Sequence, residues 1–118
     1  MLTGTVTADL QAIVVLPVAG QDWRAEIDTG FNGDLELPED LRIAVNPRYL
    51  CQSLSILAAG QSTLEDVYEV DFPFDGQIVV AETTFVPGNI ILIGAHLMRD
   101  YQLAIHYPHR ALRLERVP

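Results

Sequence analysis

Turn-forming residues recur at short intervals along this chain, and their spacing limits the length of every regular element between them. The stretches between the turns are rich in Val, Ile, Leu, Thr and Phe, residue types that favour extended strands. With 118 residues, the chain is long enough to bury one core without a disulfide or a structural metal. The sequence therefore predicts one all-β domain over residues 1–118.

Two hairpins are expected from the order of turns and strand-like runs. The first joins residues 11–18 to residues 23–27, and the second joins residues 50–58 to residues 62–70. Both connections contain a Gly, which can adopt the positive φ that tight turns need. The other expected strands are residues 34–37, 77–86, 89–93, 102–107 and 111–116.

Helical patterns are confined to two short stretches. Pro38 is followed by two acidic residues, a sequence typical of the first turn of a helix. Near the C-terminus, residues 95–101 place Leu97, Met98 and Tyr101 at spacings of one, three and four residues. This spacing predicts about two helical turns.

Composition and charge exclude several classes of protein. Hydrophobic residues make up 49% and charged residues 19% of the chain, which excludes a disordered protein. The apolar run at residues 12–18 is shorter than the ~20 residues of a membrane span. No basic and apolar leader is recognisable, so a cytoplasmic location is expected. A net charge of -9 disfavours nucleic acid as a partner, and the lone Cys51 cannot form an internal disulfide.

The tripeptide Asp28-Thr29-Gly30 is the main candidate for chemistry. Asp28 stands where an apolar-flanked strand runs into a turn, so its carboxylate is expected to project from a rigid element into reach of solvent. The Thr29 hydroxyl can bond to neighbouring backbone, and Gly30 lets another main chain approach because it has no Cβ. Such a tripeptide arises by chance in roughly 2% of chains of this length. Its surroundings therefore have to carry the interpretation.

Those surroundings resemble a known family at two places. Residues 25–38 read AEIDTGFNGDLELP, which resembles the active-site segment of clan AA (retropepsin-like) aspartic peptidases. The Phe after the tripeptide is similar to that of a microbial subfamily of the clan. About sixty residues later, residues 90–98 read IILIGAHLM and resemble the family's second motif, in which Ile93 and Gly94 lead into a short helix.

The order of the segments resembles the family as well. A hairpin tipped by Ala59, Gly60 and Gln61 lies between the two motifs, where the family carries the flap that covers its substrate. The last two expected strands resemble the family's ending. The resemblance implies a small acid-protease β-barrel with one short C-terminal helix. It implies aspartic endopeptidase activity with no cofactor and no metal ion.

The implied reaction needs two carboxylates that share one proton. One acts as a base toward water while the other polarises the scissile carbonyl. One chain offers a single such tripeptide, so we expect a homodimer in which Asp28 meets its own symmetry copy at a two-fold axis. Thr29 and Gly30 are the expected supporting residues. The expected partners are a second copy and a peptide or protein substrate in extended conformation, with neither nucleic acid nor membrane.

Other interpretations stay open. A catalytically inactive retropepsin-like module that dimerises or binds a peptide fits the small size and Phe31, which stands where many clan members carry Ala or Ser. An unrelated β-domain could use Asp28 to cap a turn. Glu26 lies two residues before Asp28 and could form a carboxylate pair within one chain. The histidines are expected to be helix or surface residues rather than metal ligands: His96, His106 and His109.

Overall fold

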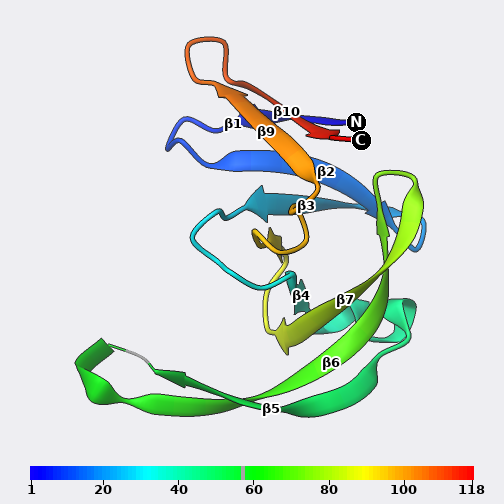
Figure 1. Ribbon diagram of the computed structural model, residues 1–118, viewed down its shortest axis with the longest axis vertical. Coiled ribbons are helices and arrows are strands. Elements are labelled where there is room, and N and C mark those ends of the chain that lie inside the picture. The colour runs from blue at the N-terminus through cyan, green and yellow to red at the C-terminus, as the bar shows by residue number, and fades with distance from the viewer. Residues whose placement is uncertain (57) are drawn as a thin grey trace.

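The computed structural model describes residues 1–56 and 58–118, in which ten strands form one strongly curved sheet (Figure 1). The strands are β1 (Leu2–Val6), β2 (Ala12–Val18), β3 (Gln21–Ile27), β4 (Leu35–Pro38), β5 (Arg48–Ile56), β6 (Ser62–Phe74), β7 (Gln77–Val86), β8 (Ile91–Ile93), β9 (Tyr101–His106) and β10 (Ala111–Arg116). Their order across the sheet is β5-β6-β7-β4-β8-β3-β2-β1-β10-β9. The predicted all-β class is confirmed, although the two outermost strands, β5 and β9, do not pair to close a barrel.

The turns of the hairpins lie where the sequence places them. Ala19 and Gly20 connect β2 to β3, with φ values of 50° and 81°. Asp75 and Gly76 connect β6 to β7, with φ values of 53° and 78°. Two consecutive residues with positive φ give a turn whose twist matches that of the flanking strands. The first predicted hairpin is confirmed, and β7 has the predicted bounds of residues 77–86.

The predicted helix at residues 95–101 is wrong. This segment is a series of tight turns, in which Met98 N–H donates to the Ala95 carbonyl at 3.1 Å and Tyr101 N–H donates to the Met98 carbonyl at 2.9 Å. Both bonds span three residues, one fewer than in an α-helix. Because β9 begins at Tyr101, the segment is too short for its hydrogen bonds to offset the unfavourable free energy of helix nucleation. The helical start after Pro38 consists of two 3₁₀ turns, Glu39–Leu41 and Ile43–Val45.

The sequence analysis also missed β1. This strand runs between β2 and β10 and pairs with both, with Gly4 opposite Val14 and Leu112. A Cβ at Gly4 would lie 2.1 Å from the Ile13 carbonyl oxygen, so only Gly fits at this point of the strand. A Gly in the middle of a strand weakens the strand pattern in the sequence. The reason why Gly is needed at position 4 is visible only in the pairing of β1 with β2.

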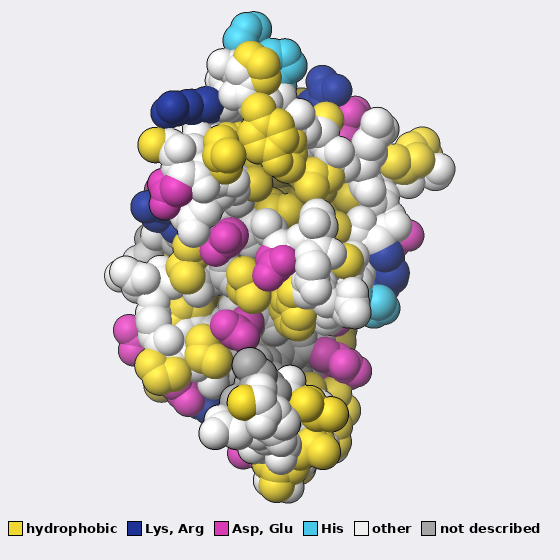
Figure 2. All heavy atoms as spheres, turned by 90° about the vertical axis from the view of Figure 1, so that its left-hand side faces the viewer, with side chains coloured by type: hydrophobic (Ala, Val, Ile, Leu, Met, Phe, Trp, Pro, Cys, Tyr) yellow, Lys and Arg dark blue, Asp and Glu magenta, His cyan; other side chains and the backbone are white. Residues whose placement is uncertain are grey.

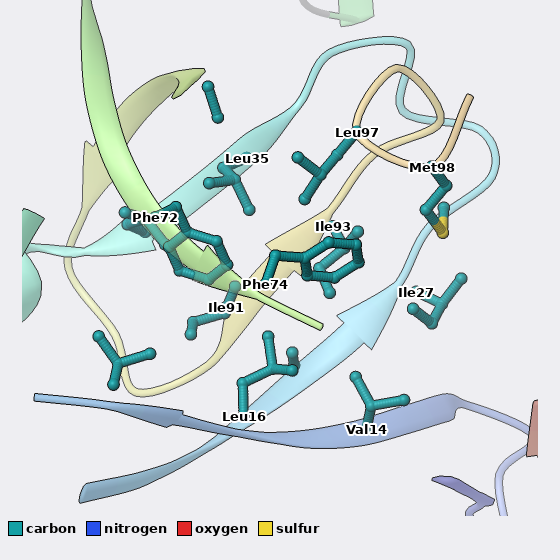
Figure 3. Packing of buried hydrophobic residues seen from close by; sticks show 14 of the residues in the cluster. Val14, Leu16, Ile27, Leu35, Phe72, Phe74, Ile91, Ile93, Leu97 and Met98 are labelled. Atoms are coloured by element: carbon teal, nitrogen blue, oxygen red, sulfur yellow. The ribbon is translucent and has the colours of Figure 1, made fainter. Parts of the chain in front are cut away.

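The core lies between the β2–β3 part of the sheet and the β6–β7 part (Figure 3). Phe72 and Phe74 of β6 extend from one side toward Leu16 of β2, with Ile91 and Ile93 of β8 packed among them. All five side chains are buried. Strand β8 is thus anchored in the middle of the core, which makes it a rigid support for the loop that follows it. No helix in the described part of the chain is long and apolar enough to cross a membrane.

Removal of the Phe72 ring tests this core. Phe72 is fully buried, so Phe72→Ala is expected to lower the free energy of unfolding by about 3–5 kcal/mol through lost burial and an unfilled cavity. Ile78→Ala, at an exposed position of β7, is the control and is expected to change it by less than about 0.5 kcal/mol. Urea unfolding at one protein concentration measures both. Equal effects would contradict the placement of the core.

Candidate active site

Two segments distant in sequence meet at the ends of β3 and β8. These strands pair in parallel, with Ile27 opposite Ile93, so both chains leave the sheet at the same edge. Asp28 N–H then donates to the Ile93 carbonyl at 2.9 Å. The predicted first motif, Asp28-Thr29-Gly30, and the predicted second motif, Ile93 and Gly94, therefore lie side by side.

The Asp28 carboxylate is held by its own turn. Gly30 N–H donates to Asp28 Oδ1 at 3.0 Å, and Phe31 N–H donates to the Asp28 carbonyl at 3.2 Å. Asp28 is half-buried, whereas Thr29 and Gly30 are exposed on the single chain. Within residues 1–56 and 58–118, the other carboxylate oxygen of Asp28 receives no hydrogen bond. One oxygen is thus oriented by backbone while the other is open to a further group.

Phe31 packs back into its own loop. A Cβ at Gly33 would lie 2.8 Å from the Phe31 ring, and a Cβ at Gly94 would lie 2.7 Å from the ring and 2.1 Å from the Gly33 carbonyl oxygen. The two glycines therefore leave the space that the ring occupies. Phe31 joins the Asp28 loop to the loop after β8 through this packing.

Asp34 is a site residue that the sequence analysis missed. Its side chain is only 8% exposed, yet both carboxylate oxygens have partners. Oδ2 accepts a hydrogen bond from Glu82 N–H at 2.9 Å, and Oδ1 lies 2.6 Å from Nδ1 of His96. His96 was expected on a helix but lies in the turns after β8, with its side chain 58% exposed. The sequence carried no sign of this pair, because the two residues are separated by 62 positions.

A second acid, Glu36, lies near Asp28. Glu36 on β4 and Glu26 on β3 are both opposite Leu92 of β8, so all three side chains are on the face away from buried Ile91 and Ile93. Burial raises the pKa of Glu36, and the negative charges of Glu65 and Asp28 raise it further. Figure 2 shows several acidic side chains across the middle of the face from which the β5–β6 hairpin projects. This face of the molecule is therefore acidic.

The β5–β6 hairpin extends beyond the rest of the sheet (Figure 1). The predicted flap residues Ala59 and Gly60 lie at its tip, with φ values of 63° and 75°, and Gln61 directly precedes β6. Leu57, which the sequence analysis placed in the expected strand at residues 50–58, is outside the described residues. The hairpin carries Glu65, whose negative charge contributes to the raised pKa of Glu36.

The remaining histidines lie at the turn between β9 and β10. His109 N–H donates to Nδ1 of His106 at 3.2 Å, and the two rings are 4.4 Å apart. Among residues 1–56 and 58–118, no three His, Cys, Asp or Glu side chains are grouped so as to hold a metal ion.

Solved structures share this architecture, whereas no protein-family model and no curated protein sequence matches the chain. A retropepsin-like aspartic protease from Rickettsia conorii is 16% identical with a TM-score of 0.67, over 97% of this chain and 89% of that one. The simian foamy virus (mac) protease is 23% identical with a TM-score of 0.58, over 74% of this chain and 91% of that one. The chain therefore has the fold of the retropepsin-like aspartic proteases.

Neutralising Glu36 tests the electrostatics of the site. Because the folded state raises the pKa of Glu36 above its ordinary value of 4.5, ionised Glu36 costs stability, and that cost appears as the pH rises through the raised pKa. Glu36→Gln should therefore raise Tm at pH 7 and change it little at pH 4. Asp9→Asn, in the exposed turn before β2, is the control, and thermal melts at both pH values are the measurement. A lower Tm at pH 7 would contradict this arrangement of charges.

Proposed function

We propose that residues 1–118 form a single aspartic endopeptidase domain that is active as a homodimer, with Asp28 as its catalytic carboxylate. One observation carries the proposal: within a retropepsin-like fold, the Asp-Thr-Gly turn presents a carboxylate with one oxygen oriented by Gly30 N–H and the other open. The class of reaction is hydrolysis of peptide bonds.

The proposed dyad consists of Asp28 from each of two subunits. A two-fold axis between them duplicates the group, so that one carboxylate takes a proton from water while the protonated one donates to the scissile carbonyl oxygen. The exposure of Thr29 and Gly30 on the single chain supports this geometry, since a surface beside the axis has to be free to meet its copy. In the dimer, the Thr29 hydroxyl would bond to backbone across the axis, and Gly30 would admit the substrate main chain.

The substrate would be a peptide or protein segment in extended conformation. Such a segment can lie between the Asp28 turns and the two β5–β6 hairpins, whose tips at Ala59, Gly60 and Gln61 would close over it. Backbone hydrogen bonds would then hold the peptide, and exclusion of water would strengthen the charges around the dyad. No cofactor takes part in this scheme.

Phe31 is compatible with activity. Its ring packs on Gly33 and Gly94, inside the loop. Two residues without side chains thus accommodate the ring within the loops. On this basis we propose that the Asp-Thr-Gly-Phe segment marks an active member of the microbial subfamily that it resembles, and not the inactive peptide-binding module.

Asp28→Asn tests the catalytic role directly. The variant should stay a folded dimer, because Asn keeps the side-chain oxygen that accepts from Gly30 N–H, while peptide hydrolysis falls by about 10²–10⁴-fold or more. Digestion of a peptide library from acidic to neutral pH, with and without a statine-type inhibitor, measures the loss. Asp9→Asn is the matched control. Turnover retained in Asp28→Asn would refute the assignment, and a wild-type protein that binds peptides without cleaving them would identify the inactive module.

The pH profile supplies a second test. Two identical carboxylates in contact lose their protons in two separate steps, and only the singly protonated pair has both a base and an acid. The rate of hydrolysis should therefore rise and then fall with increasing pH. Initial rates on one peptide across the pH range measure this, and a rate with a single inflection would argue against a carboxylate pair.

A further inference from the structure

The Asp34 carboxylate is buried and has two hydrogen-bonding partners, one from strand β7 and one from the loop after β8. Burial of a carboxylate is costly unless hydrogen bonds replace its lost water. Here the replacements are Glu82 N–H from β7, at 2.9 Å, and His96 Nδ1 from the loop after β8, at 2.6 Å. We refer to Asp34, His96 and the Glu82 N–H together as the loop clamp.

The loop clamp lies where the Asp28 loop and the loop after β8 are joined. Three backbone bonds connect these loops, from Gly94 N–H to the Asp34 carbonyl at 2.9 Å, from Ala95 N–H to the Phe31 carbonyl at 2.7 Å and from His96 N–H to the Gly33 carbonyl at 3.1 Å. Asp34 and His96 take part in this ladder with their main chains and close it with their side chains. The same two residues therefore connect the loops twice.

The chemistry of the pair determines the state of His96. An ionised carboxylate can only accept hydrogen bonds, so the short contact with Asp34 requires that Nδ1 of His96 carries a hydrogen. A charge-assisted bond of this kind is shorter and stronger than one between neutral groups. It adds rigidity to a connection that otherwise depends on backbone bonds close to the surface.

We propose that Asp34 and His96 are positioning residues, which hold the Asp28 loop at the orientation that lets Asp28 meet its symmetry copy. This inference rests on the proposed function. Neither side chain touches the substrate or the Asp28 carboxylate in this scheme. Their effect is transmitted along residues 28–34, where a displacement of about 1 Å can cost about 10²-fold in rate.

Asp34→Asn tests the clamp with a side chain of the same shape. Asn can still accept from Glu82 N–H, but it presents an NH₂ group to His96, so the neutral ring has to move its hydrogen to Nε2. We expect kcat to fall about ten- to a hundred-fold with KM changed less than about two-fold. We also expect the ¹⁵N spectrum of His96 to report the other tautomer and the Ala95 and His96 amides to exchange faster. Asp100→Asn, at an exposed acid of the same turn segment, should leave all of these unchanged.

Two substitutions at His96 distinguish loss of the hydrogen bond from a failure to fold. His96→Asn places an amide NH₂ close to the position of Nδ1 and should restore kcat to within about three-fold of the wild type. His96→Leu cannot donate and should lose activity as Asp34→Asn does. Circular dichroism checks that both variants are folded. Loss of activity in both variants to the same extent would overturn the role of the hydrogen bond.

The outcomes separate this inference from the proposed function. Wild-type kcat and wild-type amide exchange in Asp34→Asn would overturn the clamp while leaving the peptidase assignment intact. If the wild-type protein cleaves no peptide, the proposed function fails. In that case exchange at Ala95 and His96 still decides whether the clamp holds the two loops together: faster exchange in Asp34→Asn supports it, and unchanged exchange overturns it.

Discussion

The hydrogen bond from Asp28 N–H to the Ile93 carbonyl is the contact on which the candidate site depends. It continues the parallel pairing of β3 with β8, whose Ile91 and Ile93 are fully buried. A strand anchored in the core in this way cannot shift by one residue without moving its apolar side chains to the wrong face. The register of the pairing between β3 and β8 therefore sets the position of the Asp28 turn. The close approach of Gly94 to Gly33 then holds the loop after β8 against the loop after β3.

Under the proposed mechanism, the surface around Asp28 is one half of an active site. One carboxylate cannot act as base and as acid in the same step, and the single chain supplies one Asp-Thr-Gly turn. The acids Glu26 and Glu36 lie on one face of the sheet, and burial raises the pKa of Glu36, with the negative charges of Glu65 and Asp28 raising it further. A second copy across a two-fold axis would supply the missing carboxylate without any change in the chain itself.

The sequence predicted the parts of the structure that depend on local chemistry. These parts follow from residues that are neighbours in the sequence. They are the turn at Ala19 and Gly20, the bounds of β7 and the turn that begins at Asp28, where β3 ends. The segment at residues 95–101 was mistaken for a helix, because its apolar spacing does not reveal that β9 begins at Tyr101. Strand β1 was missed because the need for Gly4 arises from the Ile13 carbonyl in a neighbouring strand.

The same distinction applies to the candidate site. Asp28 and Gly94 were assigned to two motifs of one family by resemblance, and the loops that contain them are in contact. Asp34 and His96 were not paired in advance, because their contact arises from the parallel pairing of β3 with β8 and from no motif in the chain. Glu36 was likewise hidden in an alternating strand, where an exposed Glu is ordinary.

Calorimetric titration with a statine-type inhibitor tests the central claim most directly, because it counts sites per chain. If each site is made of two Asp28 residues, one inhibitor molecule binds for every two chains, and Asp28→Asn abolishes the binding heat. One inhibitor per chain, or binding by a protein that stays monomeric at the concentration used, would contradict a site shared between two subunits.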